Sequence, residues 1–166
     1  MAGKGKLSTV FGGSGFLGRQ IVWCLARRGY RVRAAVRRPD LAGYLQPMGV
    51  VGQIHAVQAN LRFADSVVRA VEGADIVINA VGILAPDGAQ TFEAVHAQGA
   101  RRVAKAARDT GARRLVHISA IGANRKSNSS YAATKAEGEA AVHAEFPSGI
   151  IRRPSIVFGP EDDCFN

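Results

Sequence analysis

Short runs of apolar and β-branched residues alternate along the chain with longer segments whose apolar positions recur every three or four residues. The short runs predict strands and the longer segments predict amphipathic helices. The predicted strands are Lys6–Phe11, Arg31–Val36, Ile54–Gln58, Ile76–Ala80, Arg114–Ile118 and Gly149–Arg152, and the predicted helices are Phe16–Arg28, Leu41–Leu45, Ala64–Glu72, Thr91–Asp109 and Ser130–Glu145. This alternation predicts an α/β fold of the Rossmann type, a doubly wound parallel sheet of at least six strands with helices on both faces. The nearly continuous apolar character of the strands implies central positions, covered on both faces.

The chain shows no linker, repeat or low-complexity segment, so we expect one domain over residues 1–166. Glycines at 29, 73 and 111 follow the ends of predicted helices, where a left-handed residue commonly ends a helix. The sequence ends at Asn166, shortly after the sixth predicted strand. We therefore expect the N-terminal part of a longer protein, with a C-terminal substrate lobe outside this chain.

A glycine-rich loop connects the first predicted strand to the first predicted helix. Glycine at 15 lets a diphosphate approach the backbone, and glycine at 18 lets the helix pack close to the strand. The helix N-terminus adds unpaired N–H groups and partial positive charge. No Lys-Ser or Lys-Thr pair follows, which excludes a P-loop. The loop predicts a dinucleotide site, the alternative being a simple turn, and its predicted binding residues are Gly12, Gly13, Ser14, Gly15, Phe16, Leu17 and Gly18.

Two arginines stand where an NAD-selective site would carry an acidic residue. Arg37 ends the second predicted strand and Arg38 follows it. A guanidinium suits a ribose 2′-phosphate and cannot accept a hydrogen bond from a 2′-hydroxyl. The pattern favours NADP(H). NAD(H) stays the alternative because Asp40 could reach a ribose, and both arginines could also be solvated charges at a strand end.

The chain is strongly basic, with a net charge of +9 and an isoelectric point near 10.4. Such charge suits an acidic protein surface, an anionic membrane surface or nucleic acid. The arginines are scattered in pairs and no basic run of five exists, so direct nucleic-acid binding is not expected. No apolar stretch is long enough to span a bilayer. Cys24 and Cys164 fit neither a disulfide framework nor a metal site, which favours a cytoplasmic location.

Four motifs occur in an order and spacing that resemble the extended and atypical short-chain dehydrogenase/reductase superfamily, which includes the NAD-dependent epimerases and dehydratases. Within it the chain is most similar to the accessory subunits of respiratory complex I and their α-proteobacterial relatives, through the glycine loop, His117–Ala123 and Lys135–Glu139. The four motifs are Gly12-x-x-Gly15-x-x-Gly18, Asn79-Ala80-Val81-Gly82, Tyr131-x-x-x-Lys135 and the run from Arg153 to Pro160.

The resemblance implies further contacts with the coenzyme. Asn60 and Leu61 stand where relatives have Asp-Leu near the adenine, so that contact would be kept in altered form. The residues after the fourth strand would pass along the ribose and nicotinamide, and two residues after the sixth strand would approach the nicotinamide. These two groups are Asn79, Ala80, Val81 and Gly82, and Pro154 and Ser155.

Tyr131 and Lys135 lie four residues apart on a predicted helix, so both side chains share one face. A lysine ammonium beside the phenol would lower its pKa and suit it to proton transfer. The resemblance implies a serine that binds the substrate oxygen, and Ser119 is the best match. His96 replaces the asparagine of many relatives, and the interval from Ser119 to Tyr131 is short. We expect His96 to be buried rather than a metal ligand.

Three functions fit these features. The first is an NADP(H)-binding accessory protein with a structural coenzyme, docked on complex I subunits or another acidic surface, peripheral on the cytoplasmic face of the inner membrane. The second is an NAD(P)-dependent reductase, epimerase or dehydratase that acts on a carbonyl or sugar-nucleotide substrate through Tyr131, Lys135 and Ser119. The third is a non-enzymatic redox-sensing regulator. Turnover that depends on Tyr131 would distinguish the second from the others.

Overall fold

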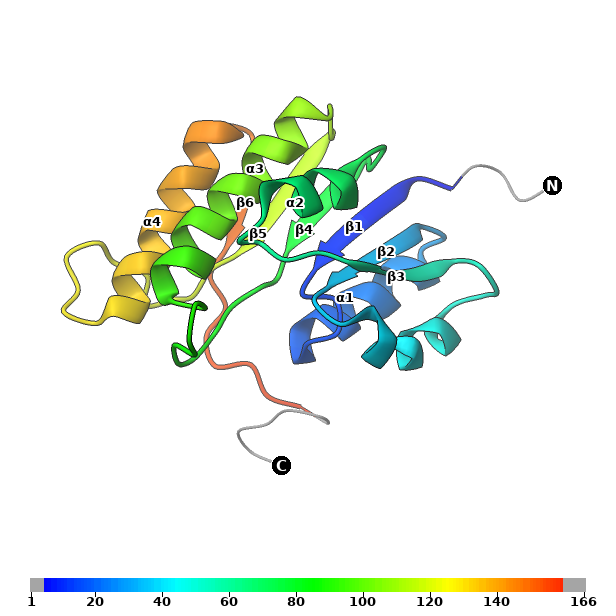
Figure 1. Ribbon diagram of the computed structural model, residues 1–166, viewed down its shortest axis with the longest axis horizontal. Coiled ribbons are helices and arrows are strands. Elements are labelled where there is room, and N and C mark those ends of the chain that lie inside the picture. Colours follow the sequence, from blue (N-terminus) through cyan, green and yellow to red (C-terminus); the bar gives the residue numbers. More distant parts are fainter. Residues whose placement is uncertain (1–4, 160–166) are drawn as a thin grey trace.

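The chain folds into one six-stranded sheet flanked by helices, as the computed structural model in Figure 1 shows for residues 5–159. Pro160 and Cys164, which entered the sequence analysis, lie outside the described residues. The strands are β1 (Leu7–Phe11), β2 (Arg31–Val36), β3 (Ile54–Gln58), β4 (Ile76–Asn79), β5 (Arg114–Ile118) and β6 (Ile150–Arg152). The α-helices are α1 (Phe16–Arg27), α2 (Ala64–Val71), α3 (Gln98–Asp109) and α4 (Ser130–Glu145). Two 3₁₀ helices, η1 (Pro39–Leu41) and η2 (Gly43–Met48), and a π-helical turn, η3 (Glu93–Ala97), complete the elements.

All strand pairs are parallel, in the order β3-β2-β1-β4-β5-β6. The chain moves outward from β1 to β3 and then returns to the other side of β1 with β4. Strand order therefore reverses between β1 and β4, and ligands of open α/β sheets bind in the crevice at such a point, beyond the carboxyl ends of the strands. The predicted Rossmann-type fold is confirmed.

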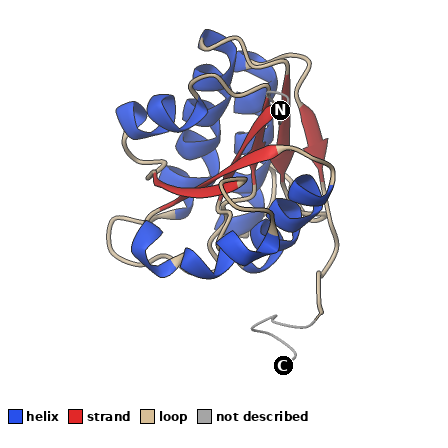
Figure 2. Ribbon diagram, turned by 90° about the vertical axis from the view of Figure 1, so that its right-hand side faces the viewer, coloured by secondary structure: helices blue, strands red, loops and turns tan. Residues whose placement is uncertain are grey.

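The sheet lies between two hydrophobic cores, with helices on both sides (Figure 2). Successive strand residues point to opposite faces. Val10 accordingly packs with Val22 of α1, whereas Phe11 packs with Val67 of α2 and Val103 of α3, and all five side chains are buried. Helix α4 packs beside α3. This sandwich fixes the strand ends that carry the site.

Two sequence-based predictions of local structure were wrong, and a third was confirmed with a local irregularity. β3 and β6 are edge strands rather than central ones, and residues such as Ile150, which is 38% exposed, lack a cover. The predicted helix Leu41–Leu45 is replaced by the ends of two 3₁₀ helices, Pro39–Leu41 and Gly43–Met48. The predicted helix Thr91–Asp109 is confirmed from Phe92 to Asp109, with the π-helical turn η3 within its first part.

The predicted glycine helix ends are confirmed. Gly29, Gly73 and Gly111 have φ values of 79°, 70° and 75°, in the left-handed region that glycine adopts without strain. Among residues 5–159, no helix combines the length and the apolar character that a membrane crossing needs.

Candidate functional site

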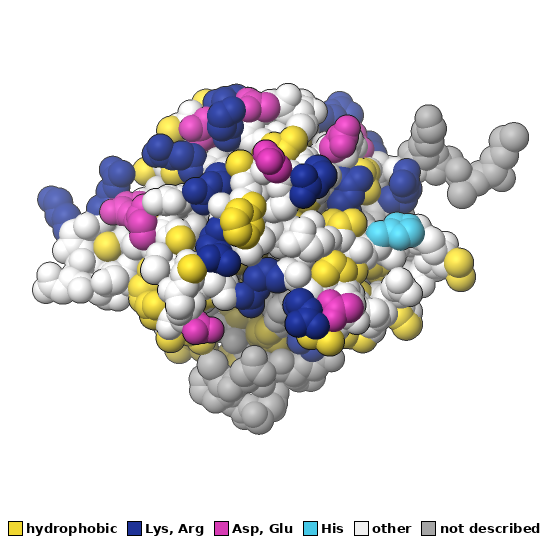
Figure 3. Space-filling view, in the orientation of Figure 1, with side chains coloured by type: hydrophobic (Ala, Val, Ile, Leu, Met, Phe, Trp, Pro, Cys, Tyr) yellow, Lys and Arg dark blue, Asp and Glu magenta, His cyan; other side chains and the backbone are white. Residues whose placement is uncertain are grey.

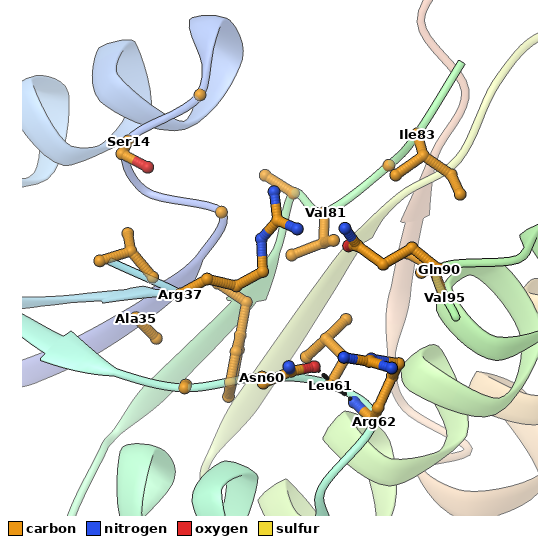
Figure 4. A pocket seen from close by; sticks show the side chains of 17 residues that line it. Ser14, Ala35, Arg37, Asn60, Leu61, Arg62, Val81, Ile83, Gln90 and Val95 are labelled. Carbon is orange, nitrogen blue, oxygen red and sulfur yellow. Dashed lines mark hydrogen bonds between the residues drawn. The ribbon is translucent and has the colours of Figure 1, made fainter. Parts of the chain in front are cut away.

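A cleft opens at the carboxyl ends of the central strands, at the point where the strand order reverses. Figure 4 shows it between the glycine loop after β1 and the segments after β2, β3 and β4. The residues that line it include Gly12, Gly15, Arg37, Asn60, Val81 and Gly82. The topology thus brings together most of the residues predicted from the first half of the sequence.

The glycine loop needs its glycines for different reasons. Gly12 has φ of 74°, and its N–H donates to the carbonyl oxygen of Ala35 at 3.0 Å, which ties the loop to β2. A β-carbon at Gly18 would lie 1.9 Å from the Gly12 carbonyl oxygen, so α1 packs against the loop only with glycine there. A β-carbon at Gly15 would lie at an ordinary 3.4 Å from the same oxygen. Gly15 is therefore not required by contacts within the chain.

The N-terminus of α1 is open to an anion. No side chain caps it, and its first turn contains no acidic residue. The first N–H groups of a helix lack partners within the helix and carry partial positive charge, so they suit a diphosphate. Tyr44 of η2 braces the loop from outside, because its hydroxyl donates to the Ser14 carbonyl oxygen at 2.6 Å. Nothing in the sequence pattern marked Tyr44.

Arg37 and Arg38 play different parts. Arg37 lines the cleft, and Figure 4 shows its guanidinium between Ser14 and Val81. Arg38 forms a two-point hydrogen bond with Asp40 (3.0 and 2.6 Å), and both side chains are exposed. Asp40, the alternative ligand for the ribose, is therefore already paired with Arg38. Arg38 also borders a shallow hollow next to the cleft, together with Ser14 and Arg37.

The end of β3 adds Asn60, Leu61 and Arg62 to the cleft. The Asn60 side-chain oxygen accepts the backbone N–H of Arg62 at 3.0 Å. The Nε atom of Arg62 is buried and has no hydrogen-bond partner among the described residues. The sequence analysis did not single out Arg62, although its place directly after Asn60-Leu61 was the signal available.

The motif from Asn79 to Gly82 begins in the core and ends in the cleft. Asn79 is buried, bonds His117 Nδ1 through its Nδ2 at 3.2 Å, and accepts the Val81 N–H at its oxygen. Its side chain thus shapes the turn from inside the sheet. Ala80, Val81 and Gly82 line the cleft.

Lys135 and His96 meet beside Gly82. A β-carbon at Gly82 would lie 3.8 Å from Lys135 Nζ and 3.9 Å from His96 Nε2. Lys135 is buried and donates to the Ile118 carbonyl oxygen at 3.0 Å. Burial lowers the pKa of Lys135 to about 8, with Glu139 acting in the opposite direction. Lys135 therefore lies at the β4 side of the cleft, although it belongs to α4, far from β4 in the sequence.

Tyr131 packs its ring edge-on against His96, with ring centres 5.3 Å apart. Burial raises the pKa of its phenol. The expected lowering of this pKa by Lys135 was wrong, because the ammonium is directed at a backbone carbonyl and loss of hydration dominates at the phenol.

His96 is buried, as predicted, with 2% of its surface exposed. Its Nε2 accepts the Ile83 N–H at 3.1 Å, so the ring proton resides on Nδ1, which lies 3.2 Å from the Thr134 hydroxyl oxygen. Burial and the nearby Lys135 charge lower its pKa to about 4, which keeps the ring neutral. His96 thereby connects the loop after β4 to α4.

Ser119 directly follows β5, at the carboxyl end of that strand. It is buried, and its N–H donates to the Arg152 carbonyl oxygen at 2.7 Å. Burial acts to raise the pKa of Glu139, but the two hydrogen bonds from the Arg153 guanidinium hold it below its ordinary value. The Ser119 hydroxyl oxygen is buried and has no hydrogen-bond partner among the described residues.

Pro154 and Ser155 follow β6 and do not line the cleft. The Pro154 carbonyl oxygen accepts the Ile121 N–H at 3.0 Å, and the Ser155 side chain is exposed. The structure thus brings together the glycine loop and the ends of β2, β3 and β4, and leaves these two residues apart.

Comparisons with known proteins agree with this geometry. A protein family described as NAD(P)H-binding matches residues 12–146. The chain is 38% identical over 165 residues to the mitochondrial NADH dehydrogenase [ubiquinone] 1 alpha subcomplex subunit 9 of Mus musculus, covering 98% of this chain and 44% of the mouse protein. It is 36% identical over 153 residues to a ceramide reductase of Caulobacter vibrioides, covering 92% of this chain and 47% of that protein.

The fold is also found among solved structures. An NAD-dependent epimerase/dehydratase, so described, of Bacillus halodurans superposes with a TM-score of 0.82 at 22% identity, over 96% of this chain and 74% of that one. The chain spans less than half the length of the two curated relatives, at 44% and 47%. The family match covers the glycine loop, the cleft and the Tyr131–Lys135 pair, and the chain belongs to the NAD(P)H-binding family.

Proposed function

We propose that the chain binds NADP(H) in preference to NAD(H). The observation that carries this proposal is the Arg37 guanidinium in the cleft, next to the glycine loop, while the acidic alternative Asp40 is held by Arg38. The described residues that line the cleft include two arginines and no acidic residue. The negative charge of a 2′-phosphate attracts a guanidinium, and its oxygens can accept two hydrogen bonds from it. A 2′-hydroxyl carries no charge and cannot bind the guanidinium as strongly.

We further propose that the coenzyme has a structural role in an accessory protein of respiratory complex I. The mouse relative carries the name of such a subunit. The Lys135 ammonium donates to the Ile118 carbonyl oxygen and burial raises the pKa of the Tyr131 phenol, which together support a site that is not set for proton transfer. Lys and Arg side chains outnumber acidic ones on the face in Figure 3, which suits docking to an acidic surface. Its place would be peripheral, on the cytoplasmic face of the inner membrane.

A carbonyl reductase is the second candidate, favoured by Lys135 beside Gly82 with Tyr131 one helical turn away. The Caulobacter relative is named a ceramide reductase. In that reaction the Tyr131 hydroxyl would give its proton to the substrate carbonyl oxygen, with Lys135 favouring the resulting phenolate. A reduced coenzyme supplies the hydride to the carbonyl carbon.

Substituting Arg37 by aspartate is expected to remove the preference for NADP(H). Titration calorimetry should show NADPH binding at least about tenfold more tightly than NADH to the unchanged protein, and Arg37→Asp should reverse that order. The matched control is Arg31→Asp, the same charge change at the exposed opposite end of β2. Equal affinities for the two coenzymes, unaltered by Arg37→Asp, would contradict the proposal.

Turnover separates the accessory protein from the reductase. We expect no oxidation of NADPH in the presence of carbonyl substrates, including long-chain keto lipids, and co-purification of the protein with complex I. Oxidation of NADPH that disappears in Tyr131→Phe, followed by its absorbance, would establish the reductase instead.

A further inference from the structure

Exposed basic side chains gather at the end of the molecule opposite the cleft. All strands are parallel, so their first residues share one edge of the sheet, toward the upper right of Figure 1 where the strand arrows begin. The last residues of α1 reach the same edge, because α1 returns the chain from the end of β1 to the start of β2. The exposed basic residues there, which we call the basic rim, are Lys6, Arg27, Arg28, Arg31, Arg113 and Arg114.

The basic rim is continuous across the sheet edge. The Arg31 N–H donates to the Lys6 carbonyl oxygen at 3.0 Å, which places these two residues side by side. A shallow hollow then extends from Lys6 to Arg113 and Arg114. Neighbouring strands lie about 4.8 Å apart, so the rim spans about 14 Å from β2 across β1 and β4 to β5.

The charge of the basic rim is directed to solvent. Within residues 5–159, none of its six side chains forms an ion pair. Acidic side chains at the same end of the molecule are engaged elsewhere. Asp109 and Glu145 both pair with Arg108, and the Asp75 carboxylate accepts the first N–H of β1 at 3.0 Å. The rim therefore presents net positive charge.

An apolar tip projects beside the basic rim. Val51 is fully exposed and Val50 is 72% exposed. The Gln53 N–H donates to the Val50 carbonyl oxygen at 3.0 Å, and Gln53 Oε1 accepts the Val50 N–H at 2.9 Å, so the turn is closed. Gln53 Nε2 also donates to the carbonyl oxygens of Ala26 and Tyr30, at 2.7 and 2.9 Å. This valine tip, Val50 and Val51, is therefore held against the end of α1 that belongs to the basic rim.

Trp23 lies one helical turn before that end of α1. It is the only tryptophan of the chain, its side chain is 40% exposed, and the Arg27 guanidinium lies 5.0 Å from the centre of its ring. Tryptophan concentrates where a membrane meets water, because its ring has an apolar body and one polar N–H. An exposed tryptophan, an apolar tip and unpaired cations thus occur together at one end of the molecule.

We propose that this end of the molecule docks on an anionic lipid bilayer. The valine tip and Trp23 enter the headgroup region, and the basic rim contacts lipid phosphates. A bilayer fits better than an acidic protein, because the valines project from a turn and a protein would need a matching pocket, whereas a fluid headgroup layer accepts them. The inference rests on the peripheral location proposed above and names the surface responsible for it. The cleft, at the other end, stays open to water.

Vesicle flotation tests the docking. The protein should bind vesicles of phosphatidylcholine with about one third phosphatidylglycerol at least about tenfold more strongly than pure phosphatidylcholine, and a several-fold rise in salt should weaken the binding. The emission of Trp23 should shift to shorter wavelength on binding. Val50→Ser with Val51→Ser should weaken the binding at least about fivefold, and Arg113→Gln with Arg114→Gln at least about tenfold.

Two controls make the same chemical changes elsewhere. Val68→Ser alters an exposed valine on α2, and Arg101→Gln with Arg125→Gln removes the same charge beside the other ends of α3 and α4. Both should bind vesicles within about threefold of the unchanged protein.

Three results would overturn the inference. The first is vesicle binding that ignores the valine tip and leaves Trp23 emission unchanged, which is attraction by net charge alone. The second is vesicle binding that the controls weaken as much as the rim variants do. The third is no vesicle binding, with co-purification with complex I lost in Arg113→Gln with Arg114→Gln, which would assign the rim to an acidic protein. NADPH should bind all variants as tightly as the unchanged protein, so a failure of NADPH binding would contradict the proposed coenzyme and leave the docking result to stand by itself.

Discussion

Replacing Gly18 by alanine is expected to lower the free energy of unfolding by about 3 kcal/mol. The added methyl carbon would lie 1.9 Å from the carbonyl oxygen and 2.7 Å from the carbonyl carbon of Gly12. Both are backbone atoms of a loop tied to β2, so α1 has to move away from the sheet. The better helix propensity of alanine, worth about 1 kcal/mol, offsets only part of the loss.

Urea denaturation and thermal unfolding measure this effect. A loss of about 3 kcal/mol corresponds to a fall in Tm of about 6–12 °C for a chain of this size. Gly15→Ala is the contrasting variant, because its methyl group would make an ordinary 3.4 Å contact at a φ of −74°. We expect its stability to stay within about 1 kcal/mol while NADPH affinity falls at least about tenfold. Native stability in Gly18→Ala would contradict the packing argument.

The fold was predictable because its signals are local. Each strand and helix carries its own periodicity, and left-handed glycines such as Gly73 end the helices where the pattern stops. Whether a strand is at an edge depends on the order of strands in the sheet, which periodicity does not contain. That is why β3 and β6 were expected to be central.

The candidate site was predictable where the backbone defines it. Gly12 and Gly18 are dictated by a turn and a close approach within a few residues of sequence. Side chains at the strand ends depend on partners far along the chain. Asn79 turns inward because His117, 38 residues away, accepts its amide proton, and Lys135 of α4 reaches the Ile118 carbonyl oxygen 17 residues away.

The two strand-end arginines illustrate the same limit. Charge alone made Arg37 and Arg38 equal candidates for a 2′-phosphate. The turn at Pro39 brings Asp40 within hydrogen-bonding reach of Arg38, so that only Arg37 is left to face the cleft. Arg62 was missed for the opposite reason, since an arginine in a loop carries no periodic signal until the cleft around it is known.

Acidification from pH 7 to pH 4 is expected to remove about 3 kcal/mol of stability through each of two buried histidines. Burial and then the Lys135 charge lower the pKa of His96 and of His117 to about 4, from an ordinary 6.5. Between those values the unfolded chain binds protons that the folded chain does not. The free energy of unfolding therefore falls as the pH drops through 6.5 and continues to fall until about pH 4.

Substitution of His96 by asparagine isolates the contribution of His96 to this pH dependence. The asparagine oxygen can still accept the Ile83 N–H that His96 Nε2 accepts in the unchanged protein. Urea denaturation at intervals from pH 7 to pH 4 should show a slope reduced by up to about half in His96→Asn. His55→Asn, the same change at an exposed histidine, should keep the slope of the unchanged protein. A profile in which His96→Asn and His55→Asn coincide would show that His96 titrates alike in the folded and unfolded chains, and burial would then not hold its ring neutral beside Lys135 and Gly82.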